Sequence, residues 1–248
     1  MRNVNICFFS GDITRSGGTE RVALLIANEL KKQKKYNVSF VSLTEKKEVP
    51  FFYIEDGIER YVLYNREVRG ITHILGYVNR LKKVVRQHKI DLIIDIDGII
   101  DMYAIPVKWL TGVKVISWEH FNFYHHPSQK LRALVRKFAV KHLDAIVTLT
   151  EQDKVYYLRE LKFQCPIEAI CNPVTYTGID NIYAADSKNI ISVGRLTYQK
   201  GFDQLPDVAD QVFCKHPEWR WLVFGEGEDR AYLEKAIKDR GLTDNVKL

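Results

Sequence analysis

Short apolar runs alternate with longer amphipathic stretches along the first two thirds of the chain. The runs are rich in Val, Ile and Phe and nearly continuous, which is typical of strands buried on both faces of a parallel sheet. Between them, apolar residues recur with the helical period, as at Val22, Leu25, Ile26 and Leu30. This alternation predicts a doubly wound α/β domain over residues 1–172. Its strands are expected at 4–10, 38–43, 91–96, 113–118, 145–148 and 167–171, and two further helices at 71–88 and 129–141.

Residues 173–188 break this pattern because they are polar, carry Pro and Gly, and lack periodicity. Such a segment predicts an interdomain linker. A second α/β pattern then begins, with strands at 189–193 and 221–224, helices at 202–215 and 231–239, and a third strand within the final residues NVKL. Three strands and two helices make half of the usual Rossmann unit. We therefore expect an incomplete second Rossmann-like domain over residues 189–248, with an exposed strand edge and uncovered apolar surface.

The composition is that of a globular protein, because 46% of the residues are apolar and 27% are charged. No stretch approaches the roughly 20 apolar residues that a membrane-crossing helix needs. The first apolar run is followed at once by Gly11 and Asp12, so we interpret it as a strand and not as a secretory signal. The four cysteines show no CxxC spacing, and a reducing cytoplasm is the simplest location.

The net charge of +6 lies entirely in the first part of the chain. Up to Asp180 there are 27 Lys and Arg against 20 Asp and Glu, and from Asn181 onward there are 10 against 11. Basic residues are predicted on the outward faces of the helices 71–88 and 129–142, preceded in the second case by the aromatic residues Phe121, Phe123 and Tyr124. This combination favours an anionic membrane surface as a partner, and the alternative is an ordinary solvated helix face. No nucleic-acid-binding signature accompanies the basic residues, so nucleic acid is not an expected partner. The basic residues are Arg80, Lys82, Lys83, Arg86, Lys130, Arg132, Arg136, Lys137 and Lys141.

The first candidate site is the loop SGGTER, residues 16–21, between a predicted strand and a predicted helix. Gly17 and Gly18 let the backbone approach a ligand, and the helix N-terminus offers free N–H groups and a positive dipole end. The loop is neither a GxGxxG fingerprint nor a GxxxxGK[ST] phosphate loop, which disfavours a Rossmann oxidoreductase. The alternative is a tight turn in which Thr19 caps the helix.

The second candidate is Glu119-His120, directly after the predicted strand that ends at Trp118. Ligands of open α/β sheets bind at the carboxyl ends of the strands, where His120 is placed to hydrogen-bond a sugar hydroxyl or to stabilise developing charge. The alternative is a histidine whose hydrogen bonds are satisfied within the fold. His125 and His126 follow, but no further residue stands at a zinc-ligand spacing, so no metal site is expected.

The third candidate is the segment VGRLTYQKGFD, in which a strand delivers Arg195 and Lys200 stands where the next helix is expected to begin. An arginine pairs with phosphate oxygens in a bidentate manner, and a lysine supplies a point charge. Two cations at a helix N-terminus indicate a clamp for a diphosphate, which stabilises the charge that grows on a leaving nucleoside diphosphate. The alternative is a chance pair of exposed cations.

Five short segments follow one another along the chain: SGGTER, EH, CNPV, VGRLTYQKGFD and VFGEGEDR. Together they resemble the family 4 glycosyltransferases, which have the GT-B fold of two Rossmann-like domains. Among these, the chain is most similar to bacterial enzymes that extend polyprenyl-diphosphate-linked glycans. The resemblance implies a first domain on the acceptor side and a second domain that binds the nucleotide sugar.

The resemblance also implies a donor site formed by Gly17, Gly18, His120, Arg195, Lys200, Gly225 and Glu226. The first two glycines would lie against the diphosphate and the transferred sugar, and the histidine would contact that sugar near the reacting centre. The basic pair would hold the diphosphate, and Gly225 and Glu226 would lie near the nucleoside. The resemblance further implies that no metal or other cofactor is required, because the basic pair would replace it.

The predicted function is retaining transfer of a sugar from a nucleotide-sugar donor to a glycan or lipid-linked oligosaccharide acceptor in surface polysaccharide synthesis. In the family the reaction is a front-face substitution, in which the leaving phosphate oxygen helps to deprotonate the acceptor. The expected location is the cytoplasm, or the inner face of the cytoplasmic membrane. The family's two glutamates, separated by seven residues after the VKL strand, are absent because the sequence ends at Leu248. The alternative hypothesis is therefore a truncated, inactive family member with a binding or assembly role.

Overall fold

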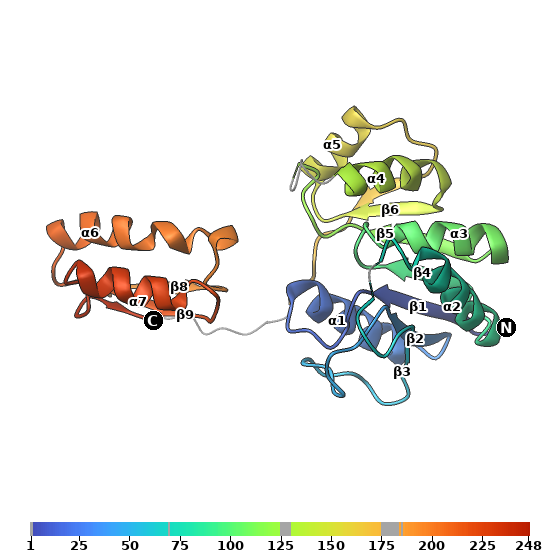
Figure 1. Cartoon of the computed structure of the whole chain (residues 1–248), viewed down its shortest axis with the longest axis horizontal. Coiled ribbons are helices and arrows are strands. Elements are labelled where there is room, and N and C mark those ends of the chain that lie inside the picture. The colour runs from blue at the N-terminus through green and yellow to red at the C-terminus, as the bar shows by residue number, and fades with distance from the viewer. Residues whose placement is uncertain (1, 69, 125–129, 175–183, 185) are drawn as a thin grey trace. The chain divides into compact units, whose positions relative to one another are not determined.

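The computed structural model describes residues 2–68, 70–124, 130–174, 184 and 186–248. The chain divides into two compact units, Met1–Thr175 and Tyr176–Leu248 (Figure 1). Most of the linker predicted over 173–188 lies outside the described residues. Each unit is an α/β domain with a parallel sheet, as the sequence predicts.

The first unit is built on a sheet of seven strands in the order β3-β2-β1-β4-β5-β6-β7. All recorded strand pairs are parallel, and Val4 of β1 lies opposite Tyr36 of β2. The order reverses at β1, where a doubly wound sheet places its ligand crevice. The strands are β1 Val4–Ser10, β2 Tyr36–Ser42, β3 Glu59–Val62, β4 Leu92–Asp95, β5 Lys114–Trp118, β6 Ala145–Thr148 and β7 Ile167–Ala169.

Helices cover both faces of this sheet, which is why its central strands are apolar without alternation. On one face, Val22 and Leu24 of α1 pack with Phe8 and Phe40 of the strands. On the other face, α2 to α5 supply the buried side chains of a second core cluster. Figure 1 shows α1 and α2 on opposite sides of β1. The helices are α1 Gly18–Lys32, α2 Ile74–Gln87, α3 Asp101–Thr111, α4 Lys130–His142 and α5 Glu151–Glu160.

Three elements of the first unit were not predicted from the sequence. The strand β3 lies at the sheet edge, and its half-exposed residues ERYV do not form an apolar run. The helix α3 is apolar on most sides and contains Pro106, which obscures its helical period. The helix α5 has only two buried side chains, Asp153 and Tyr157, so it shows no apolar stripe.

The second unit contains a three-stranded parallel sheet in the order β10-β9-β8. The helix predicted from residue 202 begins at Leu205, because two short 3-10 turns, Tyr198–Lys200 and Phe202–Gln204, precede it. The placement of Lys200 at the start of this helix is therefore wrong. The elements are β8 Asn189–Val193, α6 Leu205–Lys215, β9 Arg220–Phe224, α7 Arg230–Asp239 and β10 Val246–Lys247.

Both helices of the second unit pack on the same face of its sheet, and Figure 1 shows α6 and α7 side by side. The other face presents Ile191, Val193 and Phe224, which are 62%, 79% and 54% exposed. The uncovered apolar surface predicted for this domain is therefore present.

The chain segments that follow β8 and β9 approach each other closely. The amide of Leu196 donates a hydrogen bond to the carbonyl of Glu226 over 3.0 Å. A Cβ atom on Gly225 would lie 1.8 Å from the carbonyl oxygen of Gly194. Only glycine fits at this position without moving the backbone.

We expect Gly225→Ala to destabilise the second unit by at least about 1–3 kcal/mol, because the backbone must move to admit the methyl group. Hydrogen exchange of the β8 and β9 amides measures this change. The matched control is Gly18→Ala, where a Cβ atom meets no described atom within 4 Å. Equal protection of β8 and β9 in the parent protein and in Gly225→Ala would contradict the prediction.

Candidate functional site

The carboxyl edge of the first sheet brings together several polar residues from neighbouring strands. The strands β1, β4 and β5 lie next to one another and run in the same direction. The glycine loop follows β1, Asp95 ends β4, and Glu119 and His120 follow β5. Since the carboxyl ends of parallel strands meet at one edge, these residues share the edge at which α/β proteins bind ligands.

The glycine loop leads directly into α1, and Gly17 is the N-cap residue of that helix. Thr19 lies inside the helix, so the alternative in which it serves as the cap is wrong. A Cβ atom on Gly17 would lie 2.2 Å from Oε2 of the buried Glu20 carboxylate, which gives this glycine a packing role. Gly18 has no such contact among the described residues. A ligand role is therefore a simpler explanation for Gly18 than for Gly17.

His120 is half-buried, with its ring centroid 4.5 Å from that of Trp118. Its buried Nε2 has no hydrogen-bond partner among the described residues, so this nitrogen does not fit the alternative of a fully satisfied histidine. Burial lowers the pKa of His120 to about 4, against a smaller opposing effect of the Asp97 charge. The imidazole is therefore neutral at physiological pH and has one nitrogen unused by the fold.

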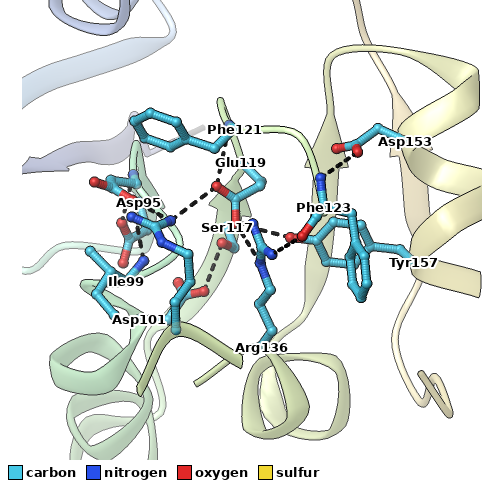
Figure 2. A network of polar contacts seen from close by, with 12 residues as sticks. Asp95, Ile99, Asp101, Ser117, Glu119, Phe121, Phe123, Arg136, Asp153 and Tyr157 are labelled. Atoms are coloured by element: carbon cyan, nitrogen blue, oxygen red, sulfur yellow. Dashed lines mark hydrogen bonds and ion pairs between the residues drawn. The ribbon is translucent and has the colours of Figure 1, made fainter. Parts of the chain in front are cut away.

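Glu119 is the centre of a buried polar network, shown in Figure 2. Its Oε1 accepts a hydrogen bond from Nη1 of Arg132 (3.3 Å), and its Oε2 accepts from Nε of Arg136 (3.1 Å) and from the hydroxyl of Tyr157 (2.9 Å). Burial raises the pKa of Glu119, while the two guanidinium groups oppose this shift. The carboxylate thus ties the end of β5 to α4 and α5, immediately before His120.

The prediction that Arg132 and Arg136 point outward is wrong, since only 7% and 6% of their surfaces are exposed. Arg132 also pairs with Asp97 through Nη1 and Oδ1 (3.0 Å), and Arg136 donates to the carbonyl of Phe123 (2.6 Å). The buried Glu119 carboxylate accounts for both orientations, because it would otherwise be an unpaired charge in the interior. The two arginines stand four residues apart and therefore lie on the same face of α4 as its buried apolar side chains. This spacing is the feature of the sequence from which their burial could have been predicted.

Two buried aspartates join the ends of β4 and β5 to the first turn of α3. Asp95 is fully buried, Asp101 is 1% exposed, and the hydroxyl of Ser117 donates to Asp101 over 2.7 Å. Burial raises the pKa of Asp95 well above its ordinary value and that of Asp101 to about 7. Burial beside the Asp101 carboxyl therefore favours the neutral form of Asp95. The sequence analysis missed this pair, although Asp95 interrupts an apolar strand.

In the second unit, Arg195 and Lys200 are exposed next to the carboxyl end of β8. Neither makes an ion pair with any described residue. Lys200 lines a cavity of about 420 Å³ together with Gly194 and Phe202. Two unpaired cations close together in the chain are chemically suited to bind an anion.

The remaining predicted pair, Gly225 and Glu226, follows β9. The backbone contact with Gly194 already explains the glycine. The Glu226 side chain is 81% exposed, and its Oε1 pairs with Nη1 of Arg230 over 2.9 Å. Arg230 also pairs with Glu234 and was not singled out in the sequence.

Within the described ranges, no group of three or more His, Cys, Asp or Glu residues is arranged to hold a metal ion. His125 and His126 lie outside the described residues. No helix in the described part of the chain is both long and apolar enough to cross a membrane.

Two family models match the sequence: Glycosyltransferase Family 4 over residues 16–176 and Glycosyl transferases group 1 over residues 180–248. An uncharacterized glycosyltransferase of Haemophilus influenzae is 33% identical, over 97% of this chain and 67% of the relative. The amylovoran biosynthesis glycosyltransferase AmsD of Erwinia amylovora is 25% identical, over 95% of this chain and 66% of the relative. An alpha-1,4-N-acetyl-D-galactosaminyltransferase of Campylobacter jejuni is 24% identical, over 92% of this chain and 63% of the relative. Its name specifies a glycan on PP-undecaprenol. The chain thus spans about two thirds of the length of these curated relatives.

Solved structures show the same fold. The lipopolysaccharide outer core galactosyltransferase WaaB has a TM-score of 0.72 and 18% identity, over 98% of this chain and 67% of that chain. HepE of Anabaena, in complex with UDP and glucose, has a TM-score of 0.68 and 17% identity, over 97% of this chain and 68% of that chain. At these identities the likeness establishes the fold alone, which is of the GT-B type.

We expect Glu119→Gln to lower the free energy of unfolding of the first unit by about 3–5 kcal/mol, because it leaves the buried Arg136 without a carboxylate and Arg132 with Asp97 alone. Urea unfolding followed by circular dichroism measures the loss. The control is Glu168→Gln, which removes an exposed carboxylate paired with Lys154 and should cost less than about 1 kcal/mol. Similar effects of the two substitutions would contradict the role given to Glu119.

We expect the His120 imidazole to titrate near pH 4 by NMR, because burial disfavours its charged form. As the pH falls from 6.5 to about 4, the unfolded chain binds a proton at this residue that the folded chain does not, so the free energy of unfolding should fall. In His120→Gln this part of the pH dependence should disappear. A titration midpoint at the ordinary value of 6.5 would contradict the prediction.

Proposed function

Because the chain belongs to glycosyltransferase family 4, we propose that it transfers a sugar from a nucleotide-sugar donor to a glycan or lipid-linked oligosaccharide acceptor in surface polysaccharide synthesis. The observation that carries the donor assignment is the pair Arg195 and Lys200, exposed and without ion-pair partners among the described residues. Both stand near the carboxyl end of β8, where α/β sheets bind ligands.

The pair is suited to the diphosphate of the donor. An arginine and a lysine bind phosphate oxygens by charge-assisted hydrogen bonds, and they stabilise the negative charge that grows as the nucleoside diphosphate leaves. No metal is then needed to neutralise that charge. The presence of UDP in the HepE complex makes UDP the first nucleotide to test.

We assign the remaining predicted residues to the same donor. Gly18 and Gly17 lie at the N-terminus of α1, whose free N–H groups and positive dipole end favour an anion or a polar sugar. His120 is assigned to a sugar hydroxyl, because its imidazole is neutral and its buried Nε2 has no hydrogen-bond partner among the described residues. Gly225 and Glu226 are assigned to the nucleoside, although the packing against Gly194 is sufficient to explain Gly225.

The proposed reaction retains the configuration of the transferred sugar. The bond from the anomeric carbon to the phosphate oxygen breaks, and the acceptor oxygen forms its bond on the same face. The acceptor proton passes to the leaving phosphate oxygen, so no side chain of the chain acts as nucleophile. The name of the Campylobacter jejuni relative supports a lipid-linked acceptor. With such an acceptor, we expect the reaction to take place at the inner face of the cytoplasmic membrane.

A second candidate function is a non-catalytic role in binding or assembly. The uncovered apolar face of the second sheet favours it, because Ile191, Val193 and Phe224 present an exposed surface that another chain segment can cover. The purified chain distinguishes the two functions. Transfer or hydrolysis of a nucleotide sugar supports the enzyme, and nucleotide binding without turnover supports the second candidate.

We expect Arg195→Ala to weaken UDP binding by about 10- to 150-fold, which corresponds to the loss of a hydrogen bond to a charged group worth about 1.5–3 kcal/mol. Arg195→Lys should recover only part of the affinity, because it keeps the charge and loses the bidentate geometry. Isothermal calorimetry of the purified chain measures both effects.

The control for this experiment is Arg220→Ala. Arg220 is also exposed, but it begins β9 and therefore lies at the opposite edge of the same sheet. UDP affinity should be unchanged in this variant. An unchanged affinity in Arg195→Ala, or equal losses in the two variants, would remove the support for the diphosphate clamp.

A further inference from the structure

The helix α4 has two chemically different sides. Its inner side carries the buried Arg132, Val135, Arg136, Ala139 and Val140. Its outer side carries Leu134 and Phe138, which stand one turn apart and are 53% and 48% exposed. Two large apolar side chains on the solvent side of one helix contribute nothing to the core.

The exposed apolar surface continues from α4 onto the end of α3. The ring of Phe138 lies 6.0 Å from that of His142, and the ring of His142 lies 5.1 Å from that of Trp109. Trp109 and the next residue, Leu110, are 58% and 51% exposed. These side chains form an apolar strip that crosses from one helix to the next, which is the kind of patch that marks an interaction surface.

Three lysines accompany this strip on the outer side of α4: Lys130, Lys137 and Lys141. All three are exposed, and none makes an ion pair with a described residue. By contrast, Lys108 and Lys114 both pair with the Asp144 carboxylate. The positive charge beside the apolar strip is therefore uncompensated within the described part of the chain.

We propose that this surface, which we call the α4 face, docks on an anionic lipid bilayer. The α4 face consists of Trp109, Leu110, Lys130, Leu134, Lys137, Phe138, Lys141 and His142. Tryptophan, leucine and phenylalanine side chains enter the boundary between headgroups and acyl chains, and the lysines contact the lipid phosphates. Three unpaired cations select a negatively charged partner, and a lipid surface is the anionic partner that also accepts a strip of exposed apolar side chains.

This proposal differs from the membrane contact expected from the sequence. Arg132 and Arg136 are removed from the basic face because they are bound to Glu119 in the interior. Trp109, Leu110, Leu134 and Phe138 are added, and only the structure brings α3 and α4 together in this way. The proposal is independent of the sugar-transfer reaction, since docking requires neither donor nor acceptor.

The experiment is co-sedimentation of the whole purified chain with vesicles, with no nucleotide or acceptor present. One vesicle contains equal parts of phosphatidylglycerol and phosphatidylcholine, and the other contains phosphatidylcholine alone. The chain should bind the first and not the second, and binding should weaken as salt screens the lysines. Binding to both vesicles alike, or to neither, would overturn the proposal.

Two variants separate the contributions of charge and of apolar insertion. Lys130→Gln with Lys137→Gln and Lys141→Gln should lower the partition coefficient on anionic vesicles about 100-fold, at about fivefold per lysine. Leu134→Ser with Phe138→Ser should lower it on the order of tenfold or more. Both variants change exposed side chains, and circular dichroism checks that the fold is kept.

The matched control removes the same charge elsewhere: Lys215→Gln with Lys235→Gln and Lys238→Gln. These lysines are exposed on α6 and α7, and none pairs with a described acidic residue. Binding should be nearly unchanged in the control. Equal losses in the control and in the α4 lysine variant would show attraction by net charge only and would overturn the assignment to this face. Self-association of the chain that disappears in Leu134→Ser with Phe138→Ser, without vesicle binding by the parent, would assign the face to a second copy and overturn it as well.

Discussion

The architecture of the first unit depends on how a single carboxylate is neutralised in the interior. Glu119 stands where β5 ends, and its charge is balanced by guanidinium groups from α4 and hydrogen-bonded by a hydroxyl from α5. Removing the Glu119 carboxylate leaves the buried Arg136 without a charge partner, which is far more costly than losing an exposed ion pair. The network therefore fixes the backbone that leads to His120, and it also fixes which side of α4 faces inward.

The positions of the strands could largely be predicted because the buried strands of a parallel sheet appear in the sequence as short, nearly continuous apolar runs. β1 and β6 lie where the apolar runs are found, since burial in a sheet covered on both faces requires apolar residues at successive positions. β8 also coincides with an apolar run, although one of its faces is exposed. β3 could not be found in this way because it lies at the edge and is partly solvated. The site was predictable to the extent that it follows from position: Glu119 and His120 come after a buried strand. The partners of Glu119 could not be predicted, because they lie on two helices later in the chain, and such long-range pairing leaves no local pattern in the sequence.

The two units differ in how their sheets are covered. In the first, helices pack on both faces, and the clusters around Phe8 and around Tyr77 form separate cores. In the second, α6 and α7 occupy one face, and the opposite face keeps its apolar side chains exposed. The glycine requirement at residue 225 arises from the same small sheet, whose strand ends approach closely enough to exclude a Cβ atom. A glycine within a motif can thus be required by packing alone, whereas Gly18 has no such explanation among the described residues.

The two-sided character of α4 limits how its sequence can change. Inserting or deleting one residue rotates the following part of the helix by about 100°. An insertion before Arg136 would carry this arginine to the exposed position of Lys137, and a deletion would carry Lys137 to the position that faces Glu119. Either change disrupts the buried network and the exposed side of the helix together. Substitutions at single exposed positions are tolerated far more easily than changes in length. The sequence of α4 can therefore diverge by substitution, but insertions and deletions within its thirteen residues are strongly disfavoured.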